Sequence, residues 1–203
     1  MQVLNLIEKN ECPFNFRLGK ELGIGADGST YDLFDEQNKV IKLSVIYEYL
    51  TKVDLVYEQY SKVLDYLISY NDPVYVRVYA HAKIGIYNRK HYNNHNKNYD
   101  TQEYLLHYYI MEKCLPLLTD EAKVFDSILP YLDGKWRKYS DESIKKILDG
   151  LSRGLDFDKE KVIIFCNNYL RSKVRQDDLH ARNIMKDIAG NYKIIDLDRC
   201  LLK

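Results

Sequence analysis

Cysteine is scarce in this chain of 203 residues, and no two cysteines are close in sequence. The four are Cys12, Cys114, Cys166 and Cys200, and no C-x-x-C pair occurs. A zinc cluster or a thioredoxin-type redox site needs closely spaced thiols. The sequence therefore predicts neither, and we expect the cysteines to be reduced thiols of the core.

The chain also lacks net charge and long apolar runs. It has 30 Lys and Arg residues against 30 Asp and Glu residues, so no long-range field draws it to nucleic acid or to an anionic membrane. Apolar stretches such as 162–166 are far shorter than a membrane-spanning helix, and residues 1–10 lack a signal-peptide pattern. We expect a soluble, cytoplasmic protein with neither nucleic acid nor membrane as partner.

Strands and one long helix are expected in the N-terminal half of the chain. Between Phe14 and Ser44, short apolar runs alternate with Gly-rich and Asp/Asn-rich breaks, which predicts an antiparallel meander of three strands. Helical spacing of apolar residues predicts a long amphipathic helix over 46–70, ended by Pro73. Strands are expected over 74–78 and 104–114, and the Asn-rich interval 88–103 is expected to be a surface loop.

Helices are expected afterwards, over 118–132, over 141–151 with Ser140 as N-cap, and over 158–174. This segregation predicts an α+β fold with two lobes. We expect a β-rich lobe with one long helix over residues 1–113 and a reduced helical lobe over residues 114–203. Ligands commonly bind in clefts between such lobes.

The last thirty residues predict a hairpin that carries oxygen ligands. Two apolar runs flank Ala189-Gly190, where we expect a two-residue turn. In that register Asn183 faces Asp196, with opposed Cβ atoms about 5 Å apart. With Asp178 on the preceding loop, the amide and carboxylate oxygens predict a site suited to Mg²⁺.

The segment D-L-H-A-R-N followed by I-I-D-L-D resembles the protein-kinase-like superfamily, particularly its aminoglycoside and choline phosphotransferase branch and small bacterial or phage kinases. The resemblance implies that Asp178 is the catalytic carboxylate and that Asn183 and Asp196 are Mg²⁺ ligands. Asp198 replaces the glycine of the D-F-G triplet. It is either a further metal ligand or a solvated charge.

The same resemblance assigns the other half of a nucleotide site to the N-terminal half of the chain. Gly23, Gly25 and Gly28 fit G-x-G-x-x-G on a predicted hairpin, which favours a phosphate-covering kinase loop over a Rossmann turn. Lys42 corresponds to the lysine that contacts the α and β phosphates and assists catalysis. The hinge beside adenine would comprise Met111, Glu112 and Cys114.

Four other side chains carry competing interpretations. Glu58 lies in the helix whose glutamate pairs with the lysine in kinases, yet it points away from the predicted apolar stripe. His180 either orients Asp178 or packs within its loop. His91 and His95 have i, i+4 spacing without an H-E-x-x-H glutamate, so solvated loop histidines are favoured over a metal site.

The sequence also departs from protein kinases. Gln176 and Asp177 replace the His-Arg pair before the catalytic aspartate, and seven residues follow Asp196, so we expect neither an activation segment nor its regulation by phosphorylation. Two functions are compatible with the motifs. The favoured one is a minimal kinase that uses ATP and Mg²⁺ on protein Ser/Thr hydroxyls; the alternative is a pseudokinase that binds a nucleotide or a protein partner.

Overall fold

The computed structural model describes residues 17–25, 27–47, 52–93, 98–132 and 141–203, without the side chains of residues 89–100 and 141. The predicted N-cap Ser140 and the loop histidine His95 therefore lie outside the described residues, as does Cys12. The chain divides into two compact units. The first comprises Met1–Ile68 and Val78–Glu112, and the second comprises Ser69–Arg77 and Lys113–Lys203.

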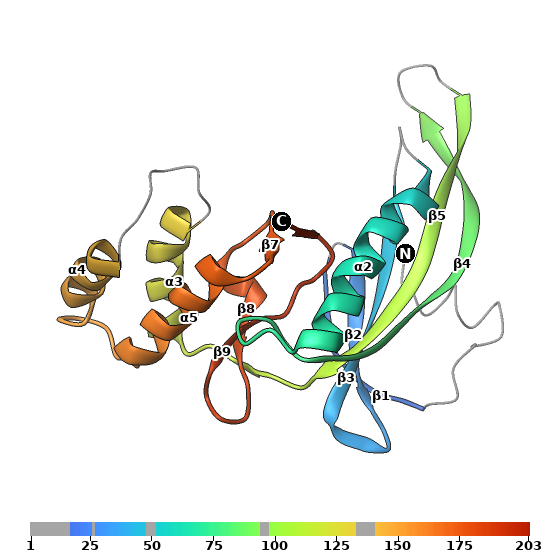
Figure 1. Ribbon diagram of the computed structural model, residues 1–203. Coiled ribbons are helices and arrows are strands. Elements are labelled where there is room, and N and C mark those ends of the chain that lie inside the picture. Colours follow the sequence, from blue (N-terminus) through green and yellow to red (C-terminus); the bar gives the residue numbers. More distant parts are fainter. Residues whose placement is uncertain (1–16, 26, 48–51, 94–97, 133–140) are drawn as a thin grey trace. The chain divides into compact units, whose positions relative to one another are not determined.

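Among its described residues, the first unit has a five-stranded antiparallel sheet and one helix, α2, from Val53 to Tyr70 (Figure 1). The strand order is β1-β2-β3-β5-β4, which confirms the predicted meander of the first three strands. The strands are β1 (Leu18–Ile24), β2 (Gly28–Leu33), β3 (Glu36–Tyr47), β4 (Val78–Asn93) and β5 (Asn98–Glu112).

The two faces of this sheet bury different side chains. One face holds an aliphatic and aromatic cluster of Tyr31, Leu33, Ile41, Leu43, Val45, Tyr104 and Leu106. The other face is covered by α2, whose Tyr60 ring lies edge-on to His107 at 5.0 Å and to Tyr109 at 6.5 Å between ring centres. Lys42 occupies the same face as its cross-strand neighbour Tyr109, because directly paired residues of a sheet point to one side.

Two boundaries in this unit differ from the sequence prediction. The helix begins at Val53 rather than near residue 46, because Ile46 and Tyr47 continue β3 and pair with β5. The expected loop over 88–103 is wrong, since β4 and β5 stay paired out to Asn93 and Asn98. Asparagine disfavours strands only weakly, and the two long backbones satisfy each other's hydrogen bonds.

The segment after α2 packs with the second unit. Helix α2 ends at Tyr70, and Asn71 adopts a φ of 44°, the left-handed conformation that asparagine tolerates at a helix end. Asp72 is buried and accepts a hydrogen bond from Ser172 Oγ at 2.7 Å, and Tyr75 pairs with Ile194 in an isolated parallel bridge. Of the strand expected over 74–78, only Val78 lies in a strand, β4.

In the part of the second unit that the structure describes, there are three α-helices and two small sheets (Figure 1). The helices are α3 (Thr119–Leu132), α4 (Asp141–Leu151) and α5 (Lys159–Arg171). The sheets pair β6 (Leu115–Pro116), β8 (Ile184–Lys186) and β9 (Tyr192–Ile194), and β7 (Val174–Gln176) with β10 (Cys200–Leu202). The α3 and α4 predictions are confirmed to within one residue. Asp158 caps α5 by accepting a hydrogen bond from Lys161 N, and α5 ends three residues earlier than expected.

The register of the β8–β9 hairpin differs from the prediction by one residue. Ile184 pairs with Ile194, so Asn183 aligns with Ile195 rather than with Asp196. The turn has three residues instead of two: Asp187 N donates to Asn191 O, and Gly190 adopts a φ of 77°. A three-residue loop with glycine in the left-handed region is a common hairpin connection, and a one-residue slip moves side chains to the opposite face.

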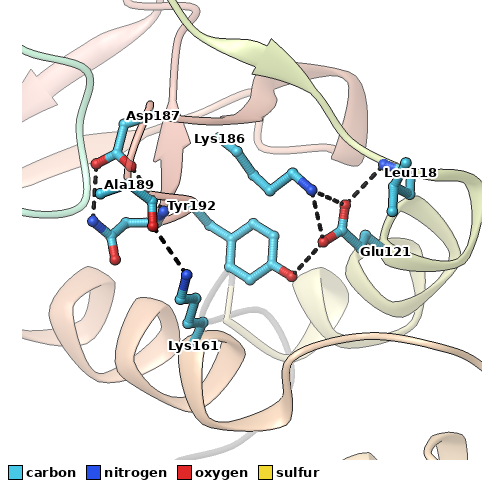
Figure 2. A network of polar contacts seen from close by, with 8 residues as sticks. Leu118, Glu121, Lys161, Lys186, Asp187, Ala189 and Tyr192 are labelled. Atoms are coloured by element: carbon cyan, nitrogen blue, oxygen red, sulfur yellow. Dashed lines mark hydrogen bonds and ion pairs between the residues drawn. The ribbon is translucent and has the colours of Figure 1, made fainter.

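A buried polar network joins this hairpin to α3 (Figure 2). The Glu121 carboxylate accepts hydrogen bonds from Lys186 Nζ, from the Tyr192 hydroxyl at 2.9 Å and from Leu118 N at 2.8 Å. Burial alone raises the pKa of Glu121, but these donors outweigh it and hold that pKa below its ordinary value. Phe125 and Phe165 pack edge-on at 5.1 Å beside the network. None of the described helices is both long and apolar enough to cross a membrane.

Candidate functional site

The glycine-rich segment forms the connection between β1 and β2. Gly25 N donates a hydrogen bond to Gly28 O at 2.8 Å, which closes a tight turn. Gly28 is buried, and a Cβ atom there would lie 2.1 Å from the carbonyl oxygen of Leu43. Gly28 is therefore needed for the approach of β2 to β3. Gly23 and Gly25 are exposed, and an added Cβ would meet nothing closer than 3.7 Å, so room for a ligand remains above their backbone.

Lys42 lies in the middle of β3, paired with Thr30 on one side and Tyr109 on the other. Its side chain is half-buried, and the ammonium lies 5.9 Å from the centre of the Tyr109 ring. This is within the range of a cation–π contact. The strand and the ring hold the lysine on the face of the sheet that α2 covers.

Glu58 is not brought to Lys42. Its side chain is exposed, whereas Tyr60 and Leu64 of the same helix are buried. With 3.6 residues per turn, a side chain two positions before Tyr60 points about 160° away from it. Among the described residues, the Glu58 carboxylate has no hydrogen bond or ion pair.

The three expected hinge residues divide between the two units. Met111 is buried in β5 between Val40 and Val78, and Glu112 ends that strand opposite Lys39. Cys114 follows in the second unit as a half-buried thiol outside any disulfide.

Asp178 and Asn183 are brought together in the second unit. They lie in the loop between β7 and β8, which ends in the short 3-10 helix η1 (Ala181–Asn183). Asn183 is buried, and its side-chain amide donates a hydrogen bond to the main-chain carbonyl of Asp178 at 2.9 Å. The amide nitrogen is thereby engaged within the loop. The Asp178 carboxylate is about half exposed, 3.8 Å from Arg199 Nη1 and 4.0 Å from His180 Nε2.

Asp196 follows β9 and is held through its main chain. The buried side chain of Gln176 donates a hydrogen bond from Nε2 to the Asp196 carbonyl, and Cys200 Sγ contacts the same oxygen at 3.9 Å. One carboxylate oxygen of Asp196 accepts a hydrogen bond from Asp198 N at 3.2 Å. Asp198 is therefore a neighbour of Asp196 through its backbone.

The donor set of this unit suits Mg²⁺. With Asn183 Nδ2 bonded to Asp178 O, the amide oxygen is the atom of Asn183 that remains for a metal, and Asp196 and Asp198 are carboxylates of the same unit. Amide and carboxylate oxygens are the hard ligands that Mg²⁺ prefers, with water and phosphate completing the shell. Within the described residues there is no group of three or more His, Cys, Asp and Glu side chains able to hold a metal. A fit of these residues to Mg²⁺ therefore depends on the side-chain oxygen of Asn183.

Gln176 and Arg199 are the residues here that sequence reasoning missed. Gln176 stands out in the sequence only as a departure from the kinase His-Arg pair, yet it anchors the segment that carries Asp196. Arg199 comes close to Asp178 because β10 pairs with β7, and Asp177 N bonds to Arg199 O. A three-residue strand pairing over this sequence distance has no local sequence signal.

Comparisons with known proteins found similar solved structures but no family. No family profile and no curated protein matches it. Among solved structures it is similar to the ROP18 kinase domain in complex with AMP-PNP and sucrose, with 12% identity and a TM-score of 0.49, over 93% of this chain and 52% of that chain. It is also similar to WbdD, with 11% identity and a TM-score of 0.47, over 94% of this chain and 34% of that chain.

A co-crystal structure of WbdD with the kinase inhibitor LY294002 matches with 13% identity and a TM-score of 0.43, over 94% and 34% of the two chains. This chain thus spans about half or less of these matched chains. Its own elements follow the kinase order: a glycine turn between β1 and β2, a lysine on β3, a helix before β4, and an Asp-to-Asn loop before the last hairpin. The element order of this chain is therefore that of a protein-kinase-like fold.

Proposed function

We propose that the protein is an ATP- and Mg²⁺-dependent phosphotransferase. The observation that carries the proposal is the pair of hydrogen bonds that fix the Asp178–Asn183 loop and the Asp196 segment within one unit, from Asn183 to Asp178 O and from Gln176 to Asp196 O. Such bonds pre-organise oxygen ligands and a base, which is how phosphotransferases gain most of their catalysis.

In this proposal each residue has a distinct role. The backbone at Gly23 and Gly25 covers the phosphates, and Lys42 binds them through its ammonium. Met111, Glu112 and Cys114 flank the adenine. Asn183 and Asp196, with Asp198 beside them, would hold Mg²⁺, which neutralises charge on the phosphates. Asp178 accepts the proton of the attacking hydroxyl, and its half-exposed carboxylate supports that role.

The acceptor favoured by the sequence is a Ser or Thr hydroxyl of a protein, which would make the protein a minimal Ser/Thr kinase acting in the cytoplasm. This acceptor stays a prediction from the sequence.

A second function is favoured by one observation. Glu58 does not reach Lys42, and in active kinases a glutamate of the corresponding helix pairs with this lysine. A pseudokinase that binds nucleotide, or uses the fold to bind a protein partner, would not need that pair. Binding without transfer would then be the whole activity.

Thermal unfolding with MgATP, followed by a transfer assay, separates these functions. If ATP binds at a few micromolar, millimolar MgATP stabilises the folded state by roughly 3 to 4 kcal/mol through mass action. Lys42→Ala and Asp196→Ala should remove this shift, whereas the exposed Lys20→Ala and Asp35→Ala should keep it. Labelled phosphate should pass to an acceptor with wild-type protein but not with Asp178→Ala. A shift without transfer by either protein would favour the nucleotide-binding pseudokinase, and no shift with any nucleotide would reject both nucleotide-dependent functions.

A further inference from the structure

The second unit contains a pocket of about 540 Å³ beside the proposed catalytic loop. This volume is within the range of small-molecule sites, roughly 300 to 1,000 Å³. Its apolar wall is formed by Pro116, Leu117, Ala122, Ala181, Ile184 and Met185. Its polar groups are Asp126 from α3 and His180 and Arg182 from the loop that carries Asp178.

Polar groups without protein partners gather at this pocket. Asp126 and Arg182 are exposed, and neither forms an ion pair or side-chain hydrogen bond with any residue in the described part of the chain. The Nδ1 atom of His180 is shielded from solvent and likewise lacks a hydrogen-bond partner there. A shielded ring nitrogen without a partner is unfavourable unless a ligand or water satisfies it.

The pocket adjoins the proposed base through His180. The Nε2 atom of this residue lies 4.0 Å from the Asp178 carboxylate, and its ring lines the pocket. A hydroxyl group must come within about 3 Å of its general base for proton transfer. A compound in the pocket is therefore well placed to extend a hydroxyl group past His180 to Asp178.

We infer that this pocket binds the phosphoryl acceptor, and that the acceptor is a small zwitterionic hydroxyl compound. Its positive group faces Asp126, its negative group faces Arg182, and its carbon body contacts the apolar wall. The inference rests on the proposed phosphotransfer. In that reaction the bond from the γ-phosphorus to the bridging oxygen of ATP breaks, a bond to the acceptor oxygen forms, the hydroxyl proton goes to Asp178, and ADP leaves.

The two opposite charges favour a zwitterion over other ligands. The Asp126 carboxylate on α3 and the Arg182 guanidinium on η1 line the same pocket and do not pair with each other. A purely cationic or purely anionic compound would leave one of them unsatisfied, which lowers affinity. The volume of the pocket also fits a compact molecule, so this structural feature points away from the protein hydroxyl that the motifs alone favour.

The experiment measures ADP formation by the full chain with MgATP and four kinds of acceptor. L-homoserine and L-threonine are zwitterions, choline is a cation, D-glycerate is an anion, and a mixture of Ser/Thr peptides represents protein acceptors. Asp126→Asn and Arg182→Gln test the two charges, with the exposed Glu142→Gln and Arg153→Gln as matched controls. Direct binding of L-homoserine without ATP is measured in parallel by NMR titration.

The expected result is turnover with a zwitterion, at least about tenfold lower kcat/KM in both pocket variants, and unchanged MgATP affinity. The controls should behave as wild type. Turnover with peptides only would overturn the inference. Turnover with choline or glycerate as fast as with the zwitterions would overturn it too. A loss of MgATP affinity in Arg182→Gln would assign that residue to the nucleotide and also overturn it.

The two proposals fail differently. Binding of L-homoserine that depends on Asp126 and Arg182, in a protein that does not bind or use ATP, would support the pocket and reject the phosphotransferase. ATP use without binding or turnover of any zwitterion would reject the assigned acceptor and leave the phosphotransferase intact. Absence of both would reject both.

Discussion

The side-chain amide of Gln176 donates a hydrogen bond to the main-chain carbonyl of Asp196, and this bond ties β7 to the segment that follows β9. Gln176 is fully buried. The bond joins the strand before the Asp178 loop to the aspartate expected to hold the metal. Correct placement of both therefore depends on a residue outside the two motifs.

Replacement of Gln176 should weaken both stability and metal-dependent binding. Gln176→Ala removes a buried hydrogen bond to the Asp196 carbonyl, and we expect the free energy of unfolding to fall by about 1 to 3 kcal/mol. Urea unfolding measures this change. Gln59→Ala, an exposed glutamine on α2, should change stability by no more than about 0.5 kcal/mol. Equal stability of Gln176→Ala and wild type would show that the bond is unimportant.

Two glycines of the same turn should respond in opposite ways. Gly28→Ala places a Cβ atom 2.1 Å from the Leu43 carbonyl and should destabilise the fold by about 1 to 3 kcal/mol. Gly23→Ala meets no atom within 4 Å and should leave stability nearly unchanged while reducing MgATP affinity. Unfolding curves and ATP titrations of both variants check this. Normal ATP affinity in Gly23→Ala would argue against a phosphate-covering turn.

The network around Glu121 should be a major source of stability in the second unit (Figure 2). Glu121→Ala leaves the Lys186 ammonium and the Tyr192 hydroxyl without their buried acceptor, and we expect a loss of about 3 to 5 kcal/mol. Tyr192→Phe removes one hydrogen bond, a loss of about 1 kcal/mol. The exposed pair of Lys123 and Asp120 is the control, since Lys123→Ala should lose less than about 1 kcal/mol. Similar losses in Glu121→Ala and Lys123→Ala would contradict this view.

Glu121 should also give the protein a pH-dependent stability. Burial alone raises the pKa of this carboxyl, but its hydrogen-bond donors lower the pKa by more than burial raises it. The pKa in the folded protein therefore lies below the ordinary value of 4.5. The contribution of Glu121 is therefore fully present above pH 4.5 and is lost as the pH falls through the folded pKa. As the pH is lowered from 7 to 3, the urea midpoint of unfolding should fall less steeply in Glu121→Gln than in wild type. Parallel curves would exclude this residue as a source of the acid sensitivity.

Thiol labelling should separate the cysteines by burial. Burial raises the pKa of Cys166 to about 12, and Cys200 is also buried, so both should react slowly with iodoacetamide in the folded protein. Cys114 is half-buried and should react first of these three. If it lies beside adenine as proposed, MgATP should slow its labelling while Cys166 is unaffected. Peptide mass spectrometry assigns each site, and unchanged labelling of Cys114 with saturating nucleotide would remove it from the proposed hinge.

The main elements could be predicted because their signals are local. Apolar periodicity predicts α3 and α4, and turn residues predict the first three strands. The errors arose where distant partners decide the outcome. Pairing with β5 keeps Ile46 and Tyr47 in a strand, and pairing with β4 turns an Asn-rich interval into a hairpin.

The residues of the candidate site come from motif spacing and stay a prediction, while the structure supplies the detail around them. Motif spacing identifies Asp178, Asn183 and Asp196, yet the Asp187–Asn191 turn with Gly190 shifts the assumed hairpin register by one residue. Gln176 could not be predicted as an anchor, because its acceptor is a main-chain atom twenty residues away. Glu58 is exposed, as its helical phase indicated.

The central claim is that Lys42 and Asp196 act on one nucleotide, and a double-mutant cycle on MgATP affinity tests it most directly. Calorimetric titration of wild type, Lys42→Ala, Asp196→Ala and the double variant gives the coupling free energy. The account predicts Mg²⁺-dependent binding at one site and a coupling of about 0.5 to 3 kcal/mol, because both residues engage the same phosphates. Strictly additive effects, or MgATP binding that neither substitution weakens, would contradict it.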